Sequence, residues 1–169
     1  MLKIEMATVD DASLLSAMGY ISYRHHFAPL WKNPSELDAY LEQEYSLPAI
    51  SSSLAEPVTF WLIAFADAPV GFAKYSLRHS IDPEGRSGAL LHKIYLMPDA
   101  TGKQYGEQLF AEVIRQAKEQ DEKWLWLEVL ADNPKARQFY ERQGMTLVKE
   151  TAFTTASQTS ILYVMEKQI

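Results

Sequence analysis

Cysteine is absent from the 169 residues. The chain therefore has no disulfides, no thiolate metal sites and no cysteine nucleophile. Long apolar runs are missing too, because none approaches the roughly 20 residues that a membrane-spanning helix needs. Residues 1–5 lack the basic region and apolar core that begin a signal peptide. A cytoplasmic enzyme is compatible with these absences, and we expect that location.

Basic residues are outnumbered. Lys and Arg number 16 against 22 Asp and Glu, so the formal net charge is −6 at pH 7. A nucleic-acid binder meets phosphates with a basic face, so we expect no nucleic-acid partner, and no membrane partner either. The acidic balance fits a cationic partner better. The remaining composition, with 47% hydrophobic and 22% charged residues, is that of a globular protein, and the length fits one domain covering residues 1–169.

The chain is organised around residues 94–109. Residues 94–97 form a β-branched and aromatic run that Pro98 ends, because proline cannot continue a central ladder. Two glycines, Gly102 and Gly106, then lead into a helical pattern. Such a strand-to-helix junction presents free backbone N–H groups at the positive end of a helix dipole. The sequence therefore predicts a site for phosphate or another anion.

Hydrophobic periodicity predicts the other elements. Asn-Pro at 33–34 and at 133–134 marks two helix starts. In chain order we expect a strand at 2–6, a helix from about 14 whose end and following loop span 20–31, helices at 34–44 and 48–54, a hairpin of strands at 60–65 and 70–77, a polar connection at 79–88, a strand at 89–97, a helix at 109–117, a strand at 124–130, a helix at 134–143, and strands at 146–152 and 159–166. This order indicates a mixed α/β fold around one sheet.

Three separated patterns resemble the GCN5-related N-acetyltransferase (GNAT) superfamily. Residues 94–98 followed by 102–106 resemble its acetyl-CoA motif, a strand ending in proline and then Gln/Arg-x-x-Gly-x-Gly/Ala. Residues 133–145 match its Asn-x-x-Ala-x-x-Phe-Tyr-x-x-x-Gly-Phe pattern, the most specific of the three. Residues 69–72 resemble part of its hairpin of second and third strands.

The resemblance implies the GNAT fold, a central and mostly antiparallel sheet of about seven strands, with a splayed parallel pair at strands 4 and 5 and about four or five flanking helices. It also implies acetyl transfer from acetyl-CoA to a primary amine, without a metal. A looser likeness at residues 33–41 and 123–129 to the polyamine acetyltransferase branch of the PaiA type favours a polyamine. The alternatives are an amino acid, antibiotic or protein N-terminus as acceptor, and a non-catalytic acyl-CoA sensor. Because dimers are common among relatives, a homodimer is a further expectation.

The resemblance assigns the cofactor contacts to the strand end, the following loop and two helix starts. The loop departs from the motif twice, because Thr101 stands where Gln or Arg is usual and Gln104 stands where Gly is usual. Glycine lets the backbone approach a pyrophosphate. Gln104 therefore either turns its side chain outward or fills the phosphate gap, and the second outcome favours the sensor. Asn133 is expected to cap its helix and to touch the pantetheine arm. The implied contacts are Tyr95, Leu96, Met97, Thr101, Gly102, Lys103, Gln104, Tyr105, Gly106, Glu107, Asn133 and Tyr140.

Catalysis needs an acid and a base. Tyr140 matches the family position that protonates the departing CoA thiolate, and packing on the sheet beside Phe139 is the alternative. The amine is a cation at neutral pH and must lose a proton before it attacks. The candidate bases are His92, on the strand before the motif, and Glu128, which suits the role if burial raises its pKa. The alternative for Glu128 is an ion pair with a structural lysine or arginine. Relatives often carry a glutamate at the position of Leu90.

The acceptor mouth is expected on the first helices. By resemblance Tyr23, His26, Phe27 and Trp31 line it, and ordinary packing of an amphipathic helix end is the alternative. His25 and His26 are not expected to bind a metal, because adjacent helical residues point about 100° apart and no third ligand has suitable spacing. Acidic residues of the second helix either attract a polyamine or form a solvated face. They are Glu36, Asp38, Glu42 and Glu44.

Overall fold

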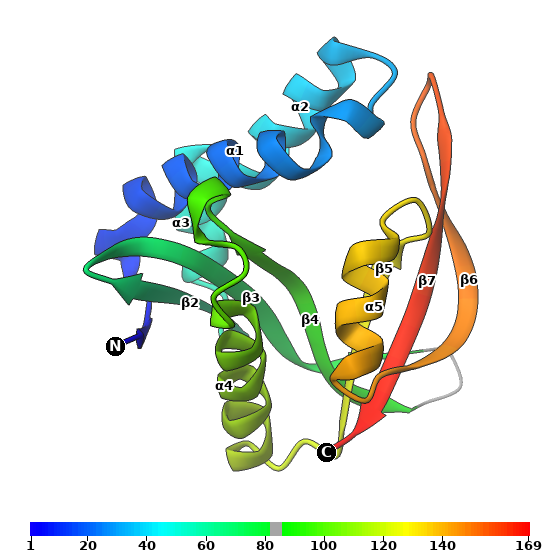
Figure 1. The fold of residues 1–169 in the computed structure, drawn as a ribbon. Coiled ribbons are helices and arrows are strands. Elements are labelled where there is room, and N and C mark those ends of the chain that lie inside the picture. The colour runs from blue at the N-terminus through cyan, green and yellow to red at the C-terminus, as the bar shows by residue number, and fades with distance from the viewer. Residues whose placement is uncertain (82–85) are drawn as a thin grey trace.

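The computed structural model describes residues 1–81 and 86–169. Their strands form one sheet of 7 strands in the order β1-β2-β3-β4-β5-β7-β6, with helices on both faces (Figure 1). The strands are β1 (Lys3–Met6), β2 (Thr59–Ala66), β3 (Ala68–Ser80), β4 (Ser87–Leu96), β5 (Trp124–Leu130), β6 (Thr146–Thr154) and β7 (Thr159–Gln168). The α-helices are α1 (Ala12–Phe27), α2 (Pro34–Tyr45), α3 (Leu47–Leu54), α4 (Tyr105–Glu119) and α5 (Pro134–Arg142). Short 3-10 turns are η1 (Val9–Asp11), η2 (Ala28–Leu30) and η3 (Pro98–Ala100).

Asparagine caps start α2 and α5 where the sequence predicts. The Asn33 side-chain oxygen accepts a hydrogen bond from the Ser35 N–H at 2.9 Å, and proline occupies the first turn of α2. Asn133 makes the same cap with the Ala136 N–H at 3.2 Å, again ahead of a proline. The side-chain oxygen satisfies a backbone donor that has no partner within the helix. Both predicted helix starts are confirmed.

The sheet has one parallel pair of strands, β4 and β5; the other neighbours of the described sheet pair antiparallel. The parallel ladder holds only Ala89 opposite Leu125 and Leu90 opposite Trp126. Beyond Leu90 the two strands are no longer paired, although both continue. The resulting gap is the splayed pair that the sequence predicts at strands 4 and 5, so the expected fold class is confirmed.

Side-chain alternation along the strands separates two apolar cores. One core lies between the sheet and the pair α4 and α5, and its buried members include Leu62, Ala73, Leu109, Phe110, Val113, Leu125 and Leu127. The other lies between the sheet and α1–α3, and its buried members include Tyr23, Phe27, Leu41, Tyr45, Trp61, Ile63 and Phe72. The sheet therefore has an α4–α5 face and an α1–α3 face, and the gap between β4 and β5 connects them.

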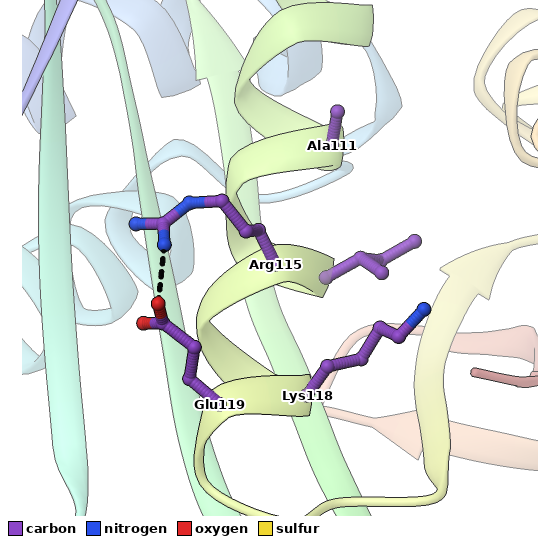
Figure 2. Close-up of a pocket in the computed structure, with 5 residues that line it drawn as sticks. Ala111, Arg115, Lys118 and Glu119 are labelled. Carbon is purple, nitrogen blue, oxygen red and sulfur yellow. Dashed lines mark hydrogen bonds and ion pairs between the residues drawn. The ribbon is translucent and has the colours of Figure 1, made fainter.

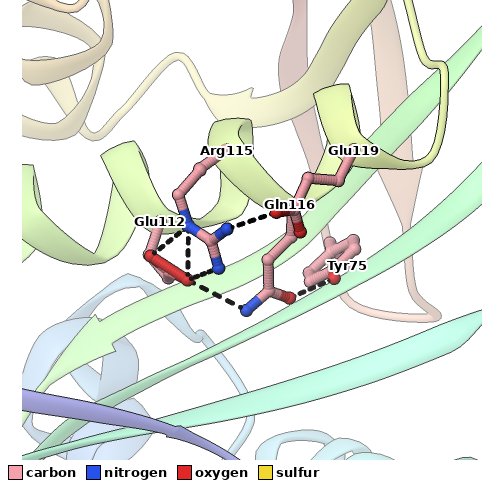
Figure 3. Close-up of polar contacts among 5 residues, drawn as sticks. All are labelled: Tyr75, Glu112, Arg115, Gln116 and Glu119. Carbon is pink, nitrogen blue, oxygen red and sulfur yellow. Dashed lines mark hydrogen bonds and ion pairs between the residues drawn. The ribbon is translucent and has the colours of Figure 1, made fainter.

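The outer surface of α4 is charged. Arg115 pairs with Glu112 at 2.5 Å and with Glu119 at 2.7 Å. Gln116 bonds Glu112 and accepts from the Tyr75 hydroxyl of β3, so the network also fixes the helix to the sheet (Figure 3). Exposed pairs of this kind stabilise a helix only weakly. A hollow beside them is lined by residues of α4 alone, which are Ala111, Ile114, Arg115, Lys118 and Glu119 (Figure 2). It is therefore separate from the gap between β4 and β5.

The tip of the β6–β7 hairpin is fastened to the start of α2. The Gln158 amide oxygen accepts from the Lys32 N–H at 2.8 Å, and the Gln158 amide nitrogen donates to the Leu30 carbonyl oxygen at 3.1 Å. The Ser157 hydroxyl donates to the Glu36 carboxylate. Figure 1 shows the hairpin reaching that end of α2. We call this contact, between residues 155–158 and residues 30–36, the clasp.

Two boundaries differ from the sequence expectation. Helix α1 continues to Phe27 and is followed directly by η2, so the segment 20–31 is mostly helical. Strand β3 runs to Ser80 and β4 starts at Ser87, so strands occupy part of the connection expected at 79–88. Residues 82–85 of that connection lie outside the described ranges. No helix in the described parts of the chain is long and apolar enough to cross a membrane.

Candidate active site

The backbone of β4 is open where β5 leaves it. The Met97 N–H donates to the Val70 carbonyl oxygen at 2.8 Å, which makes that pair a hydrogen-bonded one. Bonded and non-bonded pairs alternate along an antiparallel ladder. Leu96, opposite Gly71, therefore turns its N–H and C=O away from β3 and toward the gap. Because the ladder with β5 ends at Leu90, no acceptor for the Leu96 N–H is found within residues 1–81 and 86–169.

The loop after β4 supplies a second set of donors. Among the residues described, no acceptor is found for the backbone N–H groups of residues 102–107. The first N–H groups of a helix have no partner within it, and the helix dipole makes this end positive. Residues 101–104 are exposed, so an anion can reach these amides. The loop therefore fits the diphosphate of the CoA that the resemblance implies.

Gln104 is the helix N-cap of α4 and adopts a left-handed backbone, with a φ of 63°. Glycine occupies such positions most readily because it has no Cβ, and this explains why the related motif carries glycine there. The Gln104 side chain is exposed. The Gln104 backbone carbonyl oxygen accepts a hydrogen bond from the Gln108 backbone N–H at 3.3 Å. An exposed side chain leaves the loop amides accessible, which favours a functional phosphate loop over a plugged one.

Helix α5 places Tyr140 beside the start of α4. A Cβ added at Gly106 would lie 3.5 Å from the Phe139 ring, and the Tyr140 ring centroid is 6.2 Å from that of Phe110. Burial raises the pKa of the Tyr140 phenol well above its ordinary value. The hydroxyl is therefore protonated at neutral pH, as in any tyrosine, and burial makes it a weaker acid, so the acid role depends on its position and not on this shift. Asn133 uses its side-chain oxygen for the cap, so its NH2 group is what remains to contact a ligand.

His92 lies on the opposite face of the sheet from Tyr140, which packs in the α4–α5 core. Its Nε2 atom is 2.8 Å from the Ser76 hydroxyl oxygen. Burial, followed by the charges of Lys74 and Lys93, lowers the pKa of His92 to about 3. The ring is therefore neutral at pH 7 and has little tendency to take a proton from an ammonium group.

Glu128, the other candidate base, is exposed on β5. Its carboxylate accepts from the Thr151 hydroxyl at 3.5 Å. The burial that its assigned role required is therefore missing. Leu90, at the position where relatives often carry glutamate, packs against a small cluster that contains Trp126.

The predicted mouth residues form one aromatic cluster. Tyr23 and Phe27 are 6% and 7% exposed, with ring centroids 4.6 Å apart, and Phe27 lies 5.4 Å from Tyr95. Trp31 is half-buried, donates from its indole N–H to the Tyr23 hydroxyl at 3.3 Å, and packs 6.0 Å from Phe153. Tyr23 and Phe27 therefore serve mainly as packing, while Trp31 retains an accessible edge.

His26, the fourth predicted mouth residue, reaches β4. Its ring is half-buried, and Nε2 lies 2.8 Å from the Leu96 carbonyl oxygen. That carbonyl is on the gap side of the strand. The two residues are 70 positions apart, and no sequence pattern connects them.

Glu44 of α2 is paired within the protein. Lys93 Nζ lies 2.6 Å from Glu44 Oε1, and the Lys93 side chain is 5% exposed. Burial alone would raise the pKa of the Glu44 carboxyl, but the attraction and hydrogen bond of Lys93, with the charge of Lys74, hold it below its ordinary value. Glu36 and Asp38 are likewise engaged, by the clasp serine and by an arginine of α1. Three of the four predicted acidic residues are thus engaged within the protein, while Glu42 is exposed on α2.

Comparisons with known proteins agree on one family. A family model described as the acetyltransferase (GNAT) family matches residues 20–145. An uncharacterised N-acetyltransferase from the pepI 3′ region of Lactobacillus delbrueckii subsp. lactis is 24% identical over 142 residues, which cover 81% of this chain and 80% of that protein.

Solved structures share the fold. The PaiA N-acetyltransferase of Thermoplasma acidophilum, in complex with coenzyme A, has a TM-score of 0.82 at 21% identity and covers 100% of this chain and 99% of its own. The ribosomal-protein-S18-alanine N-acetyltransferase of Escherichia coli has a TM-score of 0.71 at 18% identity and covers 100% and 94%.

Proposed function

Because this chain belongs to the acetyltransferase (GNAT) family, and is thus an acetyl-CoA-dependent acetyltransferase, we propose that its acceptor is the primary amine of a small molecule, in particular a polyamine. The acetyl transfer on which this proposal rests is supported by the Leu96 N–H, which faces the gap between β4 and β5, and by the amides of residues 102–107, for which no acceptor is found in the described residues. The end of β4 and the loop that follows it thus offer a donor for an acetyl oxygen and a cradle for a diphosphate.

The chain's own residues divide the chemistry. Bound acetyl-CoA supplies the acetyl thioester, which the strand end at Tyr95, Leu96 and Met97 and the loop amides would hold. The Leu96 N–H stabilises the negative charge that develops on the acetyl oxygen. The Tyr140 hydroxyl holds the proton that the leaving sulfur needs. Tyr140 lies on the α4–α5 face and the mouth residues lie on the α1–α3 face, so amine and acid act from opposite sides of the gap.

Three observations favour a small cationic acceptor. The chain carries a net charge of −6, which attracts a polycation at long range. Residues 33–41 and 123–129 resemble the PaiA-type polyamine branch, and the PaiA structure covers 100% of this chain. The clasp joins the α1–α2 connection to the β6–β7 hairpin, and walls joined in this way suit a slender ligand better than the surface of a folded protein.

The test is a thiol-release screen with acetyl-CoA and a panel of spermidine, spermine, amino acids and short peptides. We expect release with the polyamines. Release only with peptides or amino acids would transfer the assignment to the corresponding alternative acceptor. If CoA raises the melting temperature while no amine in the panel releases thiol, the protein is an acyl-CoA sensor and the proposed function is wrong.

Tyr140→Phe tests the acid. Loss of the hydroxyl removes the proton donor, so turnover should fall by roughly 100-fold, and the CoA-induced rise in melting temperature should remain. Tyr20→Phe is the matched control, because Tyr20 is a half-buried tyrosine of α1 that has no assigned role. Unchanged turnover in Tyr140→Phe would remove this role from Tyr140.

A further inference from the structure

His26 lies where the gap between β4 and β5 opens. It occupies the last turn of α1, and its Nε2 atom is 2.8 Å from the Leu96 carbonyl oxygen. The N–H of the same residue is the donor assigned to the acetyl oxygen, and the N–H and C=O of one strand residue point to the same side. The imidazole therefore lies beside the backbone donor proposed for the acetyl oxygen, on the gap side of β4.

The hydrogen bond to Leu96 fixes the tautomer of His26. A carbonyl oxygen only accepts, so Nε2 must carry the hydrogen. In the neutral ring the lone pair is then on Nδ1. Across residues 1–81 and 86–169, no hydrogen bond is found at Nδ1 of His26. The ring is thus oriented by one nitrogen and has the other available to accept a proton.

The other candidate bases are less suitable. His92 is bonded to Ser76 and is a very weak base, with a pKa of about 3. Glu128 is exposed on β5, where Thr151 contacts it. His25 is adjacent to His26 but is exposed, because neighbouring helical residues point about 100° apart.

We propose that Nδ1 of His26 accepts the proton that the acceptor ammonium loses before it attacks. The inference rests on the proposed acetylation of an amine. The nitrogen enters with three hydrogens and leaves, bonded to the acetyl carbon, as an amide with one. One proton passes to Nδ1 of His26 and then to solvent. The other leaves as the C–N bond forms and replaces the proton that Tyr140 gives to the sulfur when the C–S bond breaks.

The charged and titratable groups around the end of α1 do not block this role. Arg24, two positions before His26, is held by Asp38 of α2 at 2.8 Å. His25 is the titratable neighbour on the same helix, with its ring centroid 5.0 Å from that of His26. On the elements packed against this end of α1, Tyr95 lies on β4 and Asp99 on η3.

His26→Gln is the deciding variant, because a glutamine amide can keep the hydrogen bond to the Leu96 carbonyl but cannot take up a proton at neutral pH. His25→Gln is the matched control. The measurement is kcat/KM for spermidine between pH 6 and 10 in the full-length protein, with the CoA-induced melting shift measured in parallel. We expect His26→Gln to lose roughly 100-fold near pH 7, to recover toward pH 10 as the amine deprotonates by itself, and to keep the CoA shift. His25→Gln should retain the wild-type profile.

Two results would overturn the assignment. A His26→Gln profile that parallels wild type shows that His26 is not the base, and a loss that is equal at every pH shows that the residue only positions β4. An NMR measurement on the wild-type protein gives an independent check, since neutral His26 must carry its hydrogen on Nε2, and the Nδ1–H tautomer would contradict the proposal. If wild type acetylates no amine, the proposed function itself fails; turnover with an unchanged His26→Gln profile removes only this inference.

Discussion

Gln104 shows at the scale of one residue what a departure from a motif costs. Its left-handed backbone, with a φ of 63°, disfavours a side chain by about 1–2 kcal/mol. Glycine at the same position relieves that strain but loses more conformational entropy on folding.

Gln104→Gly should therefore raise the free energy of unfolding by about 0.5–1 kcal/mol, measured by urea denaturation, and should leave CoA binding intact because the loop amides remain. Gly102→Ala is the opposite test in the same loop. Gly102 has a φ of 77°, and apart from its chain neighbours no atom of the described residues lies within 4 Å of an added Cβ. Gly102→Ala should therefore lower the free energy of unfolding through backbone strain alone. A destabilised Gln104→Gly protein would show that the glutamine side chain makes a stabilising contact.

The clasp is a contact between elements that flanks Trp31, one of the residues predicted to line the acceptor mouth. The Gln158 side chain makes two of the hydrogen bonds in the clasp. It accepts one from the Lys32 N–H and donates one to the Leu30 carbonyl oxygen, both in the segment before α2. Gln158→Ala removes both and leaves the Lys32 N–H and Leu30 carbonyl to water. The free energy of unfolding should fall by about 1–2 kcal/mol.

Hydrogen exchange provides the sharper readout for Gln158→Ala. Exchange should accelerate together in residues 30–36 and at the hairpin tip, because the clasp bonds these two segments to each other. Gln168→Ala, at the exposed end of β7, is the control and should change neither. Faster exchange spread over the entire sheet would instead indicate a general loss of stability and would argue against a local clasp.

The elements themselves were largely predictable from local sequence. The Asn-Pro pairs and the alternating runs located α2, α5 and the β2–β3 hairpin because caps, proline and side-chain period act within a few residues. The end of α1 was harder. Polar Arg24, His25 and His26 suggest a loop, yet Tyr23 and Phe27, four positions apart, place one buried stripe against the aromatic core and keep the segment helical.

The site was predictable to the extent that a motif marks it. Residues 94–106 and 133–145 correctly indicated the GNAT family, to which the chain belongs. The contacts around the predicted mouth join residues that no single motif contains. Lys93 and Glu44 are separated by 49 residues, and His26 and Leu96 by 70, so only the folded sheet brings them together. For this reason sequence position favours His92 and Glu128 as the base, whereas the base that we propose from the structure is His26.

The stability of the whole molecule should respond to acid through His92. Its pKa is lowered to about 3 in the fold, from an ordinary value of 6.5. Below pH 6.5 the unfolded chain takes up a proton that the folded chain refuses, so stability is complete above that pH and declines as the pH falls toward 3. Glu44, with its lowered pKa, adds a further loss of stability at more acidic pH, because protonation of its carboxylate breaks the ion pair with Lys93.

His92→Gln isolates the first of these effects, because the amide can still bond Ser76 and does not titrate. The wild-type protein should lose stability between pH 6.5 and pH 4.5, measured by chemical denaturation, and the variant should lose clearly less. Equal slopes for the two proteins would mean that His92 is protonated in the folded state, contrary to its buried environment.

The clasp can form only late in the synthesis of the protein. Gln158 bonds Leu30, 128 residues earlier in the chain. A ribosome that adds roughly 5–20 residues per second needs about 6–25 s to cover that distance. Throughout this interval Trp31 and Tyr40 lack the Phe153 ring that packs 6.0 Å from each of them in the finished protein. The nascent chain therefore carries an uncovered aromatic surface until its last hairpin emerges, and this is the period in which a chaperone or an aggregate competes for it.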